Sequence, residues 1–350
     1  MNAMSMTSLE RVLKTLGHQE PDRVPLFLLL SMHGAKELGL SLREYFSRPE
    51  HIIEGQLRLG QKYQNDCIYT FFYAPVESEA FGGEVIWSDD GPPVSGEPII
   101  SDIEHISQLK LPDVRSSKAL QKVFKATEKL NREVGNKIPI IGAVMSPFSL
   151  PVMQLGFEKY LELIHYRPDL FNRLIDINRE FCINYANVQL EAGATAICYF
   201  DPVSSTTIIP RETYLETGFL IARQTIAMIK GPTATLFASG RILEIVGNIA
   251  KTGTSMVGAG SQEDIGMMKA ACKGKLSVLG NMDGTGMRSW DKNKTVDIVK
   301  DLIRKAAPGG GFILSDNQGE IPFHVSDATL LTISETVQTF GHYPIQLNDE

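Results

Sequence analysis

The sequence lacks the features of membrane and nucleic-acid proteins. It has no run of about 18 consecutive apolar residues, the length that crosses a bilayer as a helix, and no Arg-flanked apolar leader at its start. We therefore expect neither a membrane-spanning segment nor export. Long Lys/Arg runs are also missing, and 34 Lys and Arg against 41 Asp and Glu give a formal net charge of −7. This balance argues against binding to nucleic acid or to an anionic membrane.

Cysteine and nucleotide-binding glycine motifs are scarce as well. The four cysteines in 350 residues lie far apart, and three fall in apolar or helical patterns, which predicts buried free thiols. Such thiols fit a reducing cytoplasm, the location we expect. The glycine-rich segments "GNMDGTG" and "PGGGF" lack the spacing of a dinucleotide or P-loop fingerprint, so no nucleotide cofactor is predicted.

Short apolar runs bounded by Gly, Pro, Asn or Asp are what the chain does contain, and they alternate with segments of helical period. This alternation predicts a (β/α)8 TIM barrel, in one domain over residues 1–350. A doubly wound open sheet is the alternative. Two additions are expected: an N-terminal helical extension within 1–19 and a hairpin excursion at 82–100, after the second strand. The eight predicted strands cover 24–30, 66–72, 138–144, 194–200, 233–238, 254–259, 276–281 and 310–315.

Polar side chains follow these strands where a barrel places its chemistry, at their C-terminal ends. We predict catalytic roles for an acidic set with one cation: Glu79, Asp201, Arg241 and Asp316. The predicted substrate-binding residues come from the same ends: His33, Tyr73, Phe148, Phe237, Ser239, Asn281, Asp283, Asn317 and Gln318.

The order of several short motifs resembles the uroporphyrinogen decarboxylase superfamily, which includes cobalamin-dependent methyltransferases on the same barrel. The resemblance spans nearly the whole chain. Its markers are "EPDRVP", "VESEAFGGEV", "SPFSL", "EAGATAICYFDPVSS", "LGNMDG" and "GGGFILSDNQGEIP".

The sequence departs from the decarboxylase pattern at the substrate anchors. That pattern implies two arginines after strand one, an aspartate after strand two, a tyrosine after strand three and a histidine near strand eight. Here the first loop has Lys36 and no arginine, and the other places fall near Tyr73, Met153 and Gln318. Lysine is a poor replacement for arginine where carboxylates are bound bidentately, so decarboxylation of a tetrapyrrole is disfavoured.

The zinc ligands of the methyltransferase branch are also absent. The resemblance implies a His-x-Cys motif after strand five and a cysteine after strand eight. In "TLFASGR" and "SDNQG" these places hold Phe237, Ser239 and Gln318. Phenylalanine, serine and glutamine do not form a zinc site, so we expect no metal there.

The hypothesis that remains is methyl transfer without a metal Lewis acid. We expect a methyltransferase acting between a small methylated substrate, such as an aryl methyl ether, and the cobalt of a cobalamin (corrinoid) carried by a separate protein. The leaving oxygen of an ether needs a proton, so Asp201 or Glu79 is the expected general acid. A homodimer is left open. A decarboxylase or related tetrapyrrole enzyme, and a non-catalytic binding module, are the alternatives.

Each predicted site residue also has a structural interpretation. Asp201 could cap a helix, Glu79 could pair with a barrel Lys or Arg, and Arg241 could neutralise nearby acids. His33 could simply pack. Phe148 and Phe237 could belong to the core. Asp283 and Asp316 could form turns.

Overall fold

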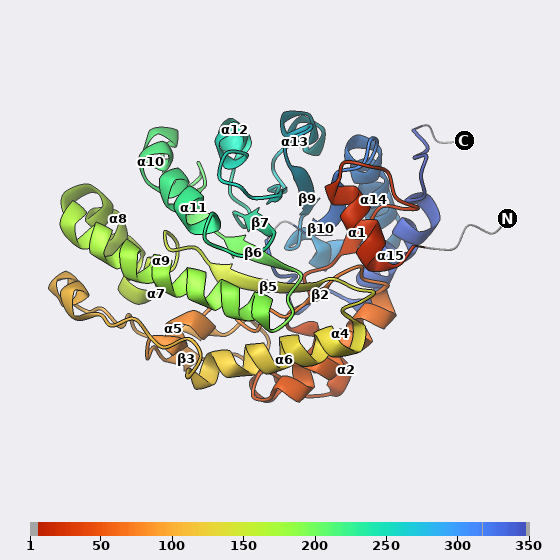
Figure 1. The fold of residues 1–350 in the computed structure, drawn as a ribbon. Helices are drawn as coiled ribbons and strands as arrows, with labels where there is room; N and C mark the ends of the chain where they lie inside the picture. The colour runs from red at the N-terminus through yellow and green to blue at the C-terminus, as the bar shows by residue number, and fades with distance from the viewer. Residues whose placement is uncertain (1–5, 317, 348–350) are drawn as a thin grey trace.

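The computed structural model describes residues 6–316 and 318–347. Eight parallel strands form one curled sheet in the order β1-β10-β9-β8-β7-β6-β5-β2, with helices on its outer face (Figure 1). All eight predicted strands are present, which confirms the barrel. They are β1 (Leu26–Phe27), β2 (Ile68–Tyr69), β5 (Ile140–Met145), β6 (Ala196–Phe200), β7 (Thr233–Leu236), β8 (Met256–Gly258), β9 (Ser277–Met282) and β10 (Phe312–Asp316).

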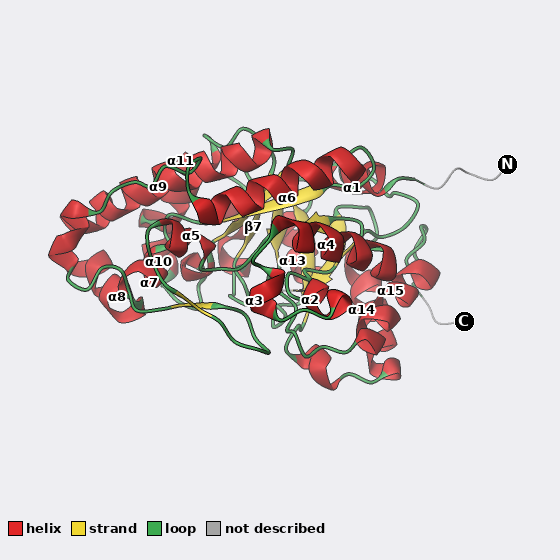
Figure 2. Cartoon of the chain, turned by 90° about the horizontal axis from the view of Figure 1, so that it is seen from below, coloured by secondary structure: helices red, strands yellow, loops and turns green. Residues whose placement is uncertain are grey.

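Helices cover the outside of the sheet because their apolar stripes pack on the outward-facing strand residues (Figure 2). No helix among the described residues is long and apolar enough to cross a membrane. The longer helices are α1 (Ser8–Leu16), α4 (Pro49–Tyr63), α6 (Lys118–Val134), α8 (Phe157–Tyr166), α9 (Pro168–Glu191), α11 (Gly218–Ile226), α13 (Ile265–Cys272), α14 (Lys292–Ala306) and α15 (Asp327–Phe340). The shorter ones are α2 (His33–Leu38), α3 (Leu42–Tyr45), α5 (Val76–Ala80), α7 (Pro151–Leu155), α10 (Arg211–Glu216) and α12 (Val246–Ile249), with 3₁₀ turns η1 (Ile103–Gln108), η2 (Pro202–Ser204), η3 (Leu243–Ile245) and η4 (Gly286–Ser289).

The seam between β1 and β2 is closed largely by side-chain amides. One backbone bond crosses it, from Asp66 N to Leu26 O at 2.7 Å. Beyond it, the Asn65 side chain accepts from Leu28 N at 2.7 Å and donates to Leu28 O at 3.0 Å. Gln56 of α4 donates to Leu30 O at 2.8 Å. Because side chains replace the backbone ladder here, β1 and β2 are two residues long although their apolar runs are longer.

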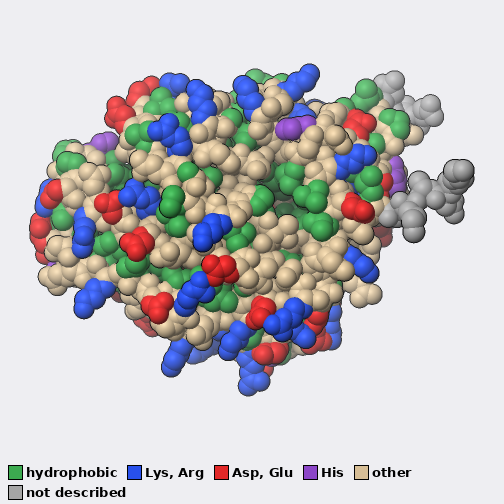
Figure 3. All heavy atoms as spheres, viewed as in Figure 1, with side chains coloured by type: hydrophobic (Ala, Val, Ile, Leu, Met, Phe, Trp, Pro, Cys, Tyr) green, Lys and Arg blue, Asp and Glu red, His purple; other side chains and the backbone are tan. Residues whose placement is uncertain are grey.

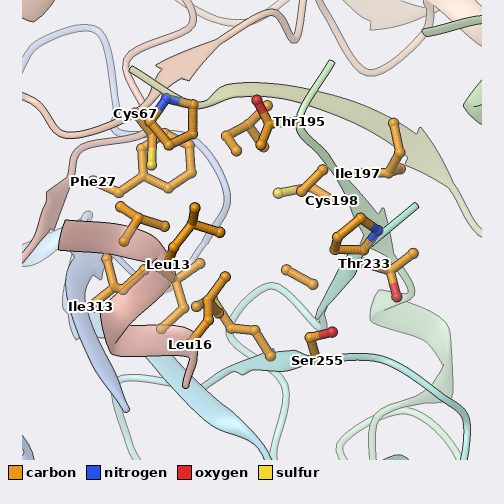
Figure 4. A pocket seen from close by; sticks show the side chains of 18 of the residues that line it. Leu13, Leu16, Phe27, Cys67, Thr195, Ile197, Cys198, Thr233, Ser255 and Ile313 are labelled. Atoms are coloured by element: carbon orange, nitrogen blue, oxygen red, sulfur yellow. The ribbon is translucent and has the colours of Figure 1, made fainter. Parts of the chain in front are cut away.

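The N-terminal helical extension covers the bottom of the barrel. Helix α1 begins with a capping box in which Thr7 and Glu10 bond each other's backbone N–H. Its Leu13 and Leu16 point into an apolar cavity of about 80 Å³ at the N-terminal ends of the strands (Figure 4). The cavity lies at the opposite end of the strands from the residues predicted to act, so it is not the predicted site.

The predicted hairpin is present as β3 (Val85–Ile86) and β4 (Val94–Ser95), which pair antiparallel. Asp90 in its turn makes a 3.4 Å contact with Nε2 of His324, which follows β10. The excursion after strand two therefore reaches the loop after strand eight of the barrel.

All four cysteines are buried free thiols, as predicted. Cys67 and Cys198 lie in the barrel interior, where burial raises the pKa of the Cys198 thiol to about 12. Thiols that hold their protons so strongly are poor nucleophiles, so they serve as packing residues.

Candidate active site

Aromatic rings fill the upper barrel interior, towards the C-terminal ends of the strands. The Tyr69 ring stacks on Phe71 with centroids 5.4 Å apart, and Phe71 lies 5.8 Å from Phe200. Phe71 is half-buried and Phe200 is 8% exposed. The barrel mouth therefore has an aromatic wall, defined by Tyr69, Phe71 and Phe200.

The loop after β10 lies against this wall. Tyr69 donates its hydroxyl hydrogen to Gly319 O at 3.3 Å. A Cβ added to Gly319 would meet Phe200 Cε1 at 2.3 Å, and φ at this residue is +89°. Only glycine fits both the backbone conformation and the close approach to the ring. The chain at Gly319 is thereby held against Phe200 and Tyr69.

Two carboxyl groups flank Gly319. Asp316 is buried, and its Oδ2 accepts from the backbone N–H groups of Gln318 at 3.0 Å and Gly319 at 3.1 Å. Its Oδ1 has no hydrogen-bond partner among the described residues. Burial raises the pKa of Asp316 to about 6. Glu320 accepts from the Ser31 hydroxyl, and burial, with the nearby Asp316 charge, raises its pKa to about 7.

Asn281 is the last residue but one of β9, and its neighbour in register on β10 is Ser315. Its Nδ2 donates to Gly260 O at 2.8 Å and Glu263 O at 3.0 Å, which fixes the loop after β8. The residue is 5% exposed, and its Oδ1 has no partner within the described part of the chain. Leu279, two residues earlier, packs in the barrel interior, so Asn281 occupies an inward position.

Asp201 occupies the wall and not the interior. Phe200 packs inside the barrel, and the next side chain points the other way. The Asp201 Oδ1 accepts from Ser146 Oγ at 2.5 Å and Ser149 Oγ at 2.8 Å, and burial raises the pKa of this carboxyl to about 6. Asp201 stands at the N-cap of η2 without a side-chain capping bond, so it acts as an anchor for the loop after β5.

Glu79 and Tyr73 face away from the barrel axis. The Tyr73 hydroxyl donates to Glu79 Oε2 at 2.5 Å, and Lys122 of α6 donates to the same hydroxyl at 3.3 Å. The Tyr73 ring packs against Phe46 and Trp87 outside the barrel. Glu79 therefore lies with Tyr73 and α6, apart from the serines that bond Asp201. A helix sends residues two apart to opposite sides, and on α5 it is Glu77 that takes the buried side.

Glu77 is the buried acid of α5, and it was not among the predicted site residues. Its Oε1 accepts from Met145 N at 2.7 Å, while Oε2 is buried without a partner among the residues described. Burial raises the pKa of Glu77 to about 8. The signal in the sequence was the pair Glu77 and Glu79 in "ESE". The pattern alone does not predict which of these two carboxylates is buried.

His33 is packed rather than exposed at the mouth. Its ring lies edge-on to Phe323 with centroids 6.1 Å apart, and the side chain is 1% exposed. Burial and the Lys36 charge lower the pKa of His33 to about 3, so the imidazole is neutral. Neither ring nitrogen has a hydrogen-bond partner among the described residues.

Phe148 and Phe237, which were predicted to bind substrate, are buried in the core outside the barrel. Phe148 packs edge-on to Tyr160 at 5.8 Å and to Phe171 at 6.2 Å. Phe237 is 2% exposed in the same core.

The remaining predicted residues lie on the rim. Arg241 is exposed and its backbone bonds Thr206 and Thr207. Ser239 is also exposed. Asp283 is exposed and its carboxylate accepts from Thr285 N, as a turn former does. Gln318 donates to Thr285 Oγ1 at 2.8 Å. Asn317 lies outside the described residues.

The geometry does not fit a zinc ion at the three places where the resemblance implies ligands. Phe237 has no donor atom and lies in the core, and Gln318 is bonded to Thr285. Among the described residues, no group of three or more His, Cys, Asp or Glu side chains could hold a metal.

On the face in Figure 3, basic and acidic side chains are interspersed, and no large surface of one sign is visible.

Fold and site together define a parallel α/β barrel with an acidic, aromatic-walled mouth. The profile of the uroporphyrinogen decarboxylase (URO-D) family matches residues 7–340. The chain therefore belongs to the URO-D family, which is a family of enzymes.

Relatives and structural neighbours agree on the barrel and differ in their names. Uroporphyrinogen decarboxylases from Cupriavidus pinatubonensis and Coxiella burnetii are each 23% identical, over 94% and 95% of this chain and 96% and 95% of their own. A methyltransferase from Methanosarcina mazei superposes with a TM-score of 0.84 at 20% identity, over 96% of this chain and 99% of that one. A B12-independent methionine synthase from Shewanella sp. has a TM-score of 0.56 at 13% identity, over 83% and 87%. At these identities the structural likeness concerns the fold.

Proposed function

We propose that this chain is a methyltransferase that moves a methyl group between a small methylated molecule and the cobalt of a corrinoid carried by a separate protein. The observation that carries the proposal is the character of the mouth: carboxyl groups on an aromatic wall, with no arginine pair in the loop after β1. An enzyme that holds a substrate with many carboxylates needs the opposite charge. The likeness of the fold to the M. mazei methyltransferase adds support.

The chemistry available at this mouth is proton donation. When a methyl ether loses its methyl to a nucleophile, the carbon–oxygen bond breaks and its electron pair stays on oxygen, which then takes a proton. A carboxyl group whose pKa lies near neutrality can supply that proton. Burial raises the pKa values of Asp316 to about 6 and Glu320 to about 7, and both groups flank the aromatic wall. Asp201 directly follows Phe200 of this wall in the chain, and burial raises its pKa to about 6. It is therefore a further candidate for the proton donor.

The test is a methyl-transfer assay with free cob(I)alamin and a panel of methyl ethers, methylamines and methylthiols. The reaction is monitored by the change in absorbance of the corrinoid. We expect one class of donor to react. No methyl transfer from any donor of the panel would contradict the proposal.

Uroporphyrinogen decarboxylation is the second candidate, favoured by the names of the curated relatives. Incubation with uroporphyrinogen and analysis of the products for lost carboxylates decides it. Loss of carboxylates at enzymatic rates, without methyl transfer, would make the chain a carboxy-lyase.

A further inference from the structure

The barrel interior is underfilled at the N-terminal ends of its strands. Barrels of this kind are usually packed by layers of bulky, branched side chains. Here the interior residues at this end include Ala196 and Cys198 of β6, Ala234 of β7 and Cys67 just before β2, all of them small. Cys198 and Ala234 are neighbours in register, so two small residues lie side by side. The volume that they leave is the apolar cavity of about 80 Å³.

Helix α1 closes this cavity from below. Leu9, Val12, Leu13 and Leu16 are three or four positions apart, on one face of the helix, and all four line the cavity. Figure 4 shows Leu13 and Leu16 opposite Cys198 and Thr233 across the empty space. The Leu13 side chain is also 54% exposed, so it lies at the boundary between the cavity and solvent. The cavity therefore has walls from the barrel and a floor from a separate element.

The lining offers no charge to a ligand. None of the described residues that line the cavity has an ionised side chain. The hydroxyl groups of two threonines are occupied, because Thr195 Oγ1 accepts from Ile140 N at 3.0 Å and Thr233 Oγ1 donates to Thr254 Oγ1 at 3.2 Å. Burial raises the pKa of the Cys198 thiol to about 12, so the thiol stays neutral. A charged molecule would lose its hydration here and gain no partner, so the lining fits an uncharged, apolar molecule.

The volume of the cavity sets the size of that molecule. An apolar cavity of about 150 Å³ in another protein takes up benzene or xenon. The cavity under α1 has about 80 Å³, roughly half of that room. A xenon atom or a hydrocarbon of about three carbons fits such a space better than a benzene ring. An occupant restores the dispersion contacts that the lining of an empty cavity lacks.

We propose that the cavity between α1 and the N-terminal ends of the strands is a binding site for a small uncharged apolar molecule, of the size of xenon or cyclopropane. The site is separate from the proposed function, because it lies at the other end of the strands and its lining holds no acid that donates a proton. Its occupant contacts α1 and the barrel together, so binding also stabilises the N-terminal helix in its place.

The experiment is titration of the full chain with xenon, measured by the xenon NMR shift. We expect saturable binding. Ala234→Leu fills the space from β7 and should weaken xenon binding by about tenfold or more. Ala328→Leu, the same exchange at an exposed position on α15, should leave the affinity within about twofold. Ala196→Leu repeats the test from β6 if Ala234→Leu does not fold.

Crystals of the wild type under xenon pressure locate the atom independently of any variant. We expect xenon in contact with Ala234 of the barrel and Leu16 of α1. Xenon found only at other places overturns the proposal, as does ordered water in the cavity that xenon does not displace. Equal xenon affinity of the wild type and a folded Ala234→Leu protein also overturns it.

Cyclopropane and ethylammonium, which are similar in size, separate apolar binding from a general effect of added solute. Cyclopropane should raise the melting temperature of the wild type and slow hydrogen exchange of the α1 amides, because it binds the folded chain and not the unfolded one. Ethylammonium should do neither, and cyclopropane should do neither in Ala234→Leu. An equal rise in melting temperature with both solutes, or in both proteins, contradicts a site at this cavity.

Discussion

Glu77 shows how a single side chain couples the site region to pH. It is buried under α5 with one oxygen on Met145 N and the other without a partner among the described residues, and burial raises its pKa to about 8. In the unfolded chain its pKa is about 4.5. Between these values the folded protein keeps a proton that the unfolded chain has lost.

This difference predicts that Glu77 destabilises the fold as the pH rises. Below about pH 4.5 both states are protonated and Glu77 contributes nothing. From there to about pH 8 the unfolded state binds fewer protons, so the free energy of unfolding falls by up to about 1.4 kcal/mol for each pH unit. Glu77→Gln keeps an acceptor for Met145 N and should lose this dependence. Melting temperatures of both proteins from pH 5 to 8 measure it, with Glu212→Gln, an exposed exchange on α10, as control. Parallel curves for the wild type and Glu77→Gln would show that Glu77 is ionised in the folded state.

The sequence named Asp201 and Glu79 together as candidates for the general acid, and their variants distinguish the two. Glu79 faces Tyr73 and α6, so Glu79→Gln should retain turnover within about threefold on an identified donor. Asp201→Asn keeps the shape but weakens the anchoring of Ser146 and Ser149, and should lower turnover by about 10²-fold or more if Asp201 is the acid. Unchanged turnover in Asp201→Asn assigns the proton to Asp316 or Glu320. A large loss in Glu79→Gln would mean that α5 lies differently in the working enzyme.

At the scale of elements, the seam between β1 and β2 is the least regular part of the barrel. Elsewhere the strands exchange backbone hydrogen bonds, for example over five residue pairs between β5 and β6. At the seam, Asn65 replaces a strand neighbour by bonding both Leu28 N and Leu28 O. The sequence run 24–30 predicted a strand of seven residues, and the side-chain amides explain why β1 is shorter.

Removing this amide should open the seam. Asn65→Ala leaves the buried N–H of Leu28 without its partner, whereas Leu28 O still accepts from Leu30 N at 3.0 Å. We therefore expect the free energy of unfolding to fall by about 1–3 kcal/mol. Asn187→Ala is the matched control, because Asn187 also bonds one backbone N–H and one C=O, those of Lys230 and Met228, at an exposed position. Its cost should stay below about 1 kcal/mol. Denaturant unfolding of the three proteins measures the difference, and similar losses in both variants would show that water replaces the amide at the seam.

At the scale of the whole molecule, the barrel brings residues from every part of the chain to one end. The mouth joins Tyr69 of β2, Phe200 of β6, Asn281 of β9 and the loop after β10, although they are far apart in sequence. The opposite end is closed by α1 over an apolar cavity. We therefore expect ligand chemistry at the C-terminal ends of the strands, as in barrels generally.

The purified protein should carry no stoichiometric zinc. Phe237 lies in the core with no donor atom, so the three places implied by the zinc branch offer at most two side chains that could bind metal. Elemental analysis of protein purified without chelator measures the zinc content. One tightly held zinc ion per chain that Ser239→Ala removes would refute this expectation.

The sequence by itself determined the eight strands, the hairpin at 82–100 and the buried thiols. These follow from local patterns: apolar runs with period, turn residues and the order of motifs. It also placed Asn281, Asp316 and Gln318 at strand ends, since position along a strand is a property of the chain alone.

Only the tertiary structure decided which side chains face the mouth. A strand sends successive side chains to opposite faces, and packing sets which set turns inward. Once Phe200 packs against Phe71 inside the barrel, Asp201 must lie in the wall, and Phe237 meets helices for the same reason that Leu236 fills the interior. Glu320 gains its place because Gly319 fits against Phe200 and Tyr69, a contact between residues more than 100 positions apart that no local pattern encodes.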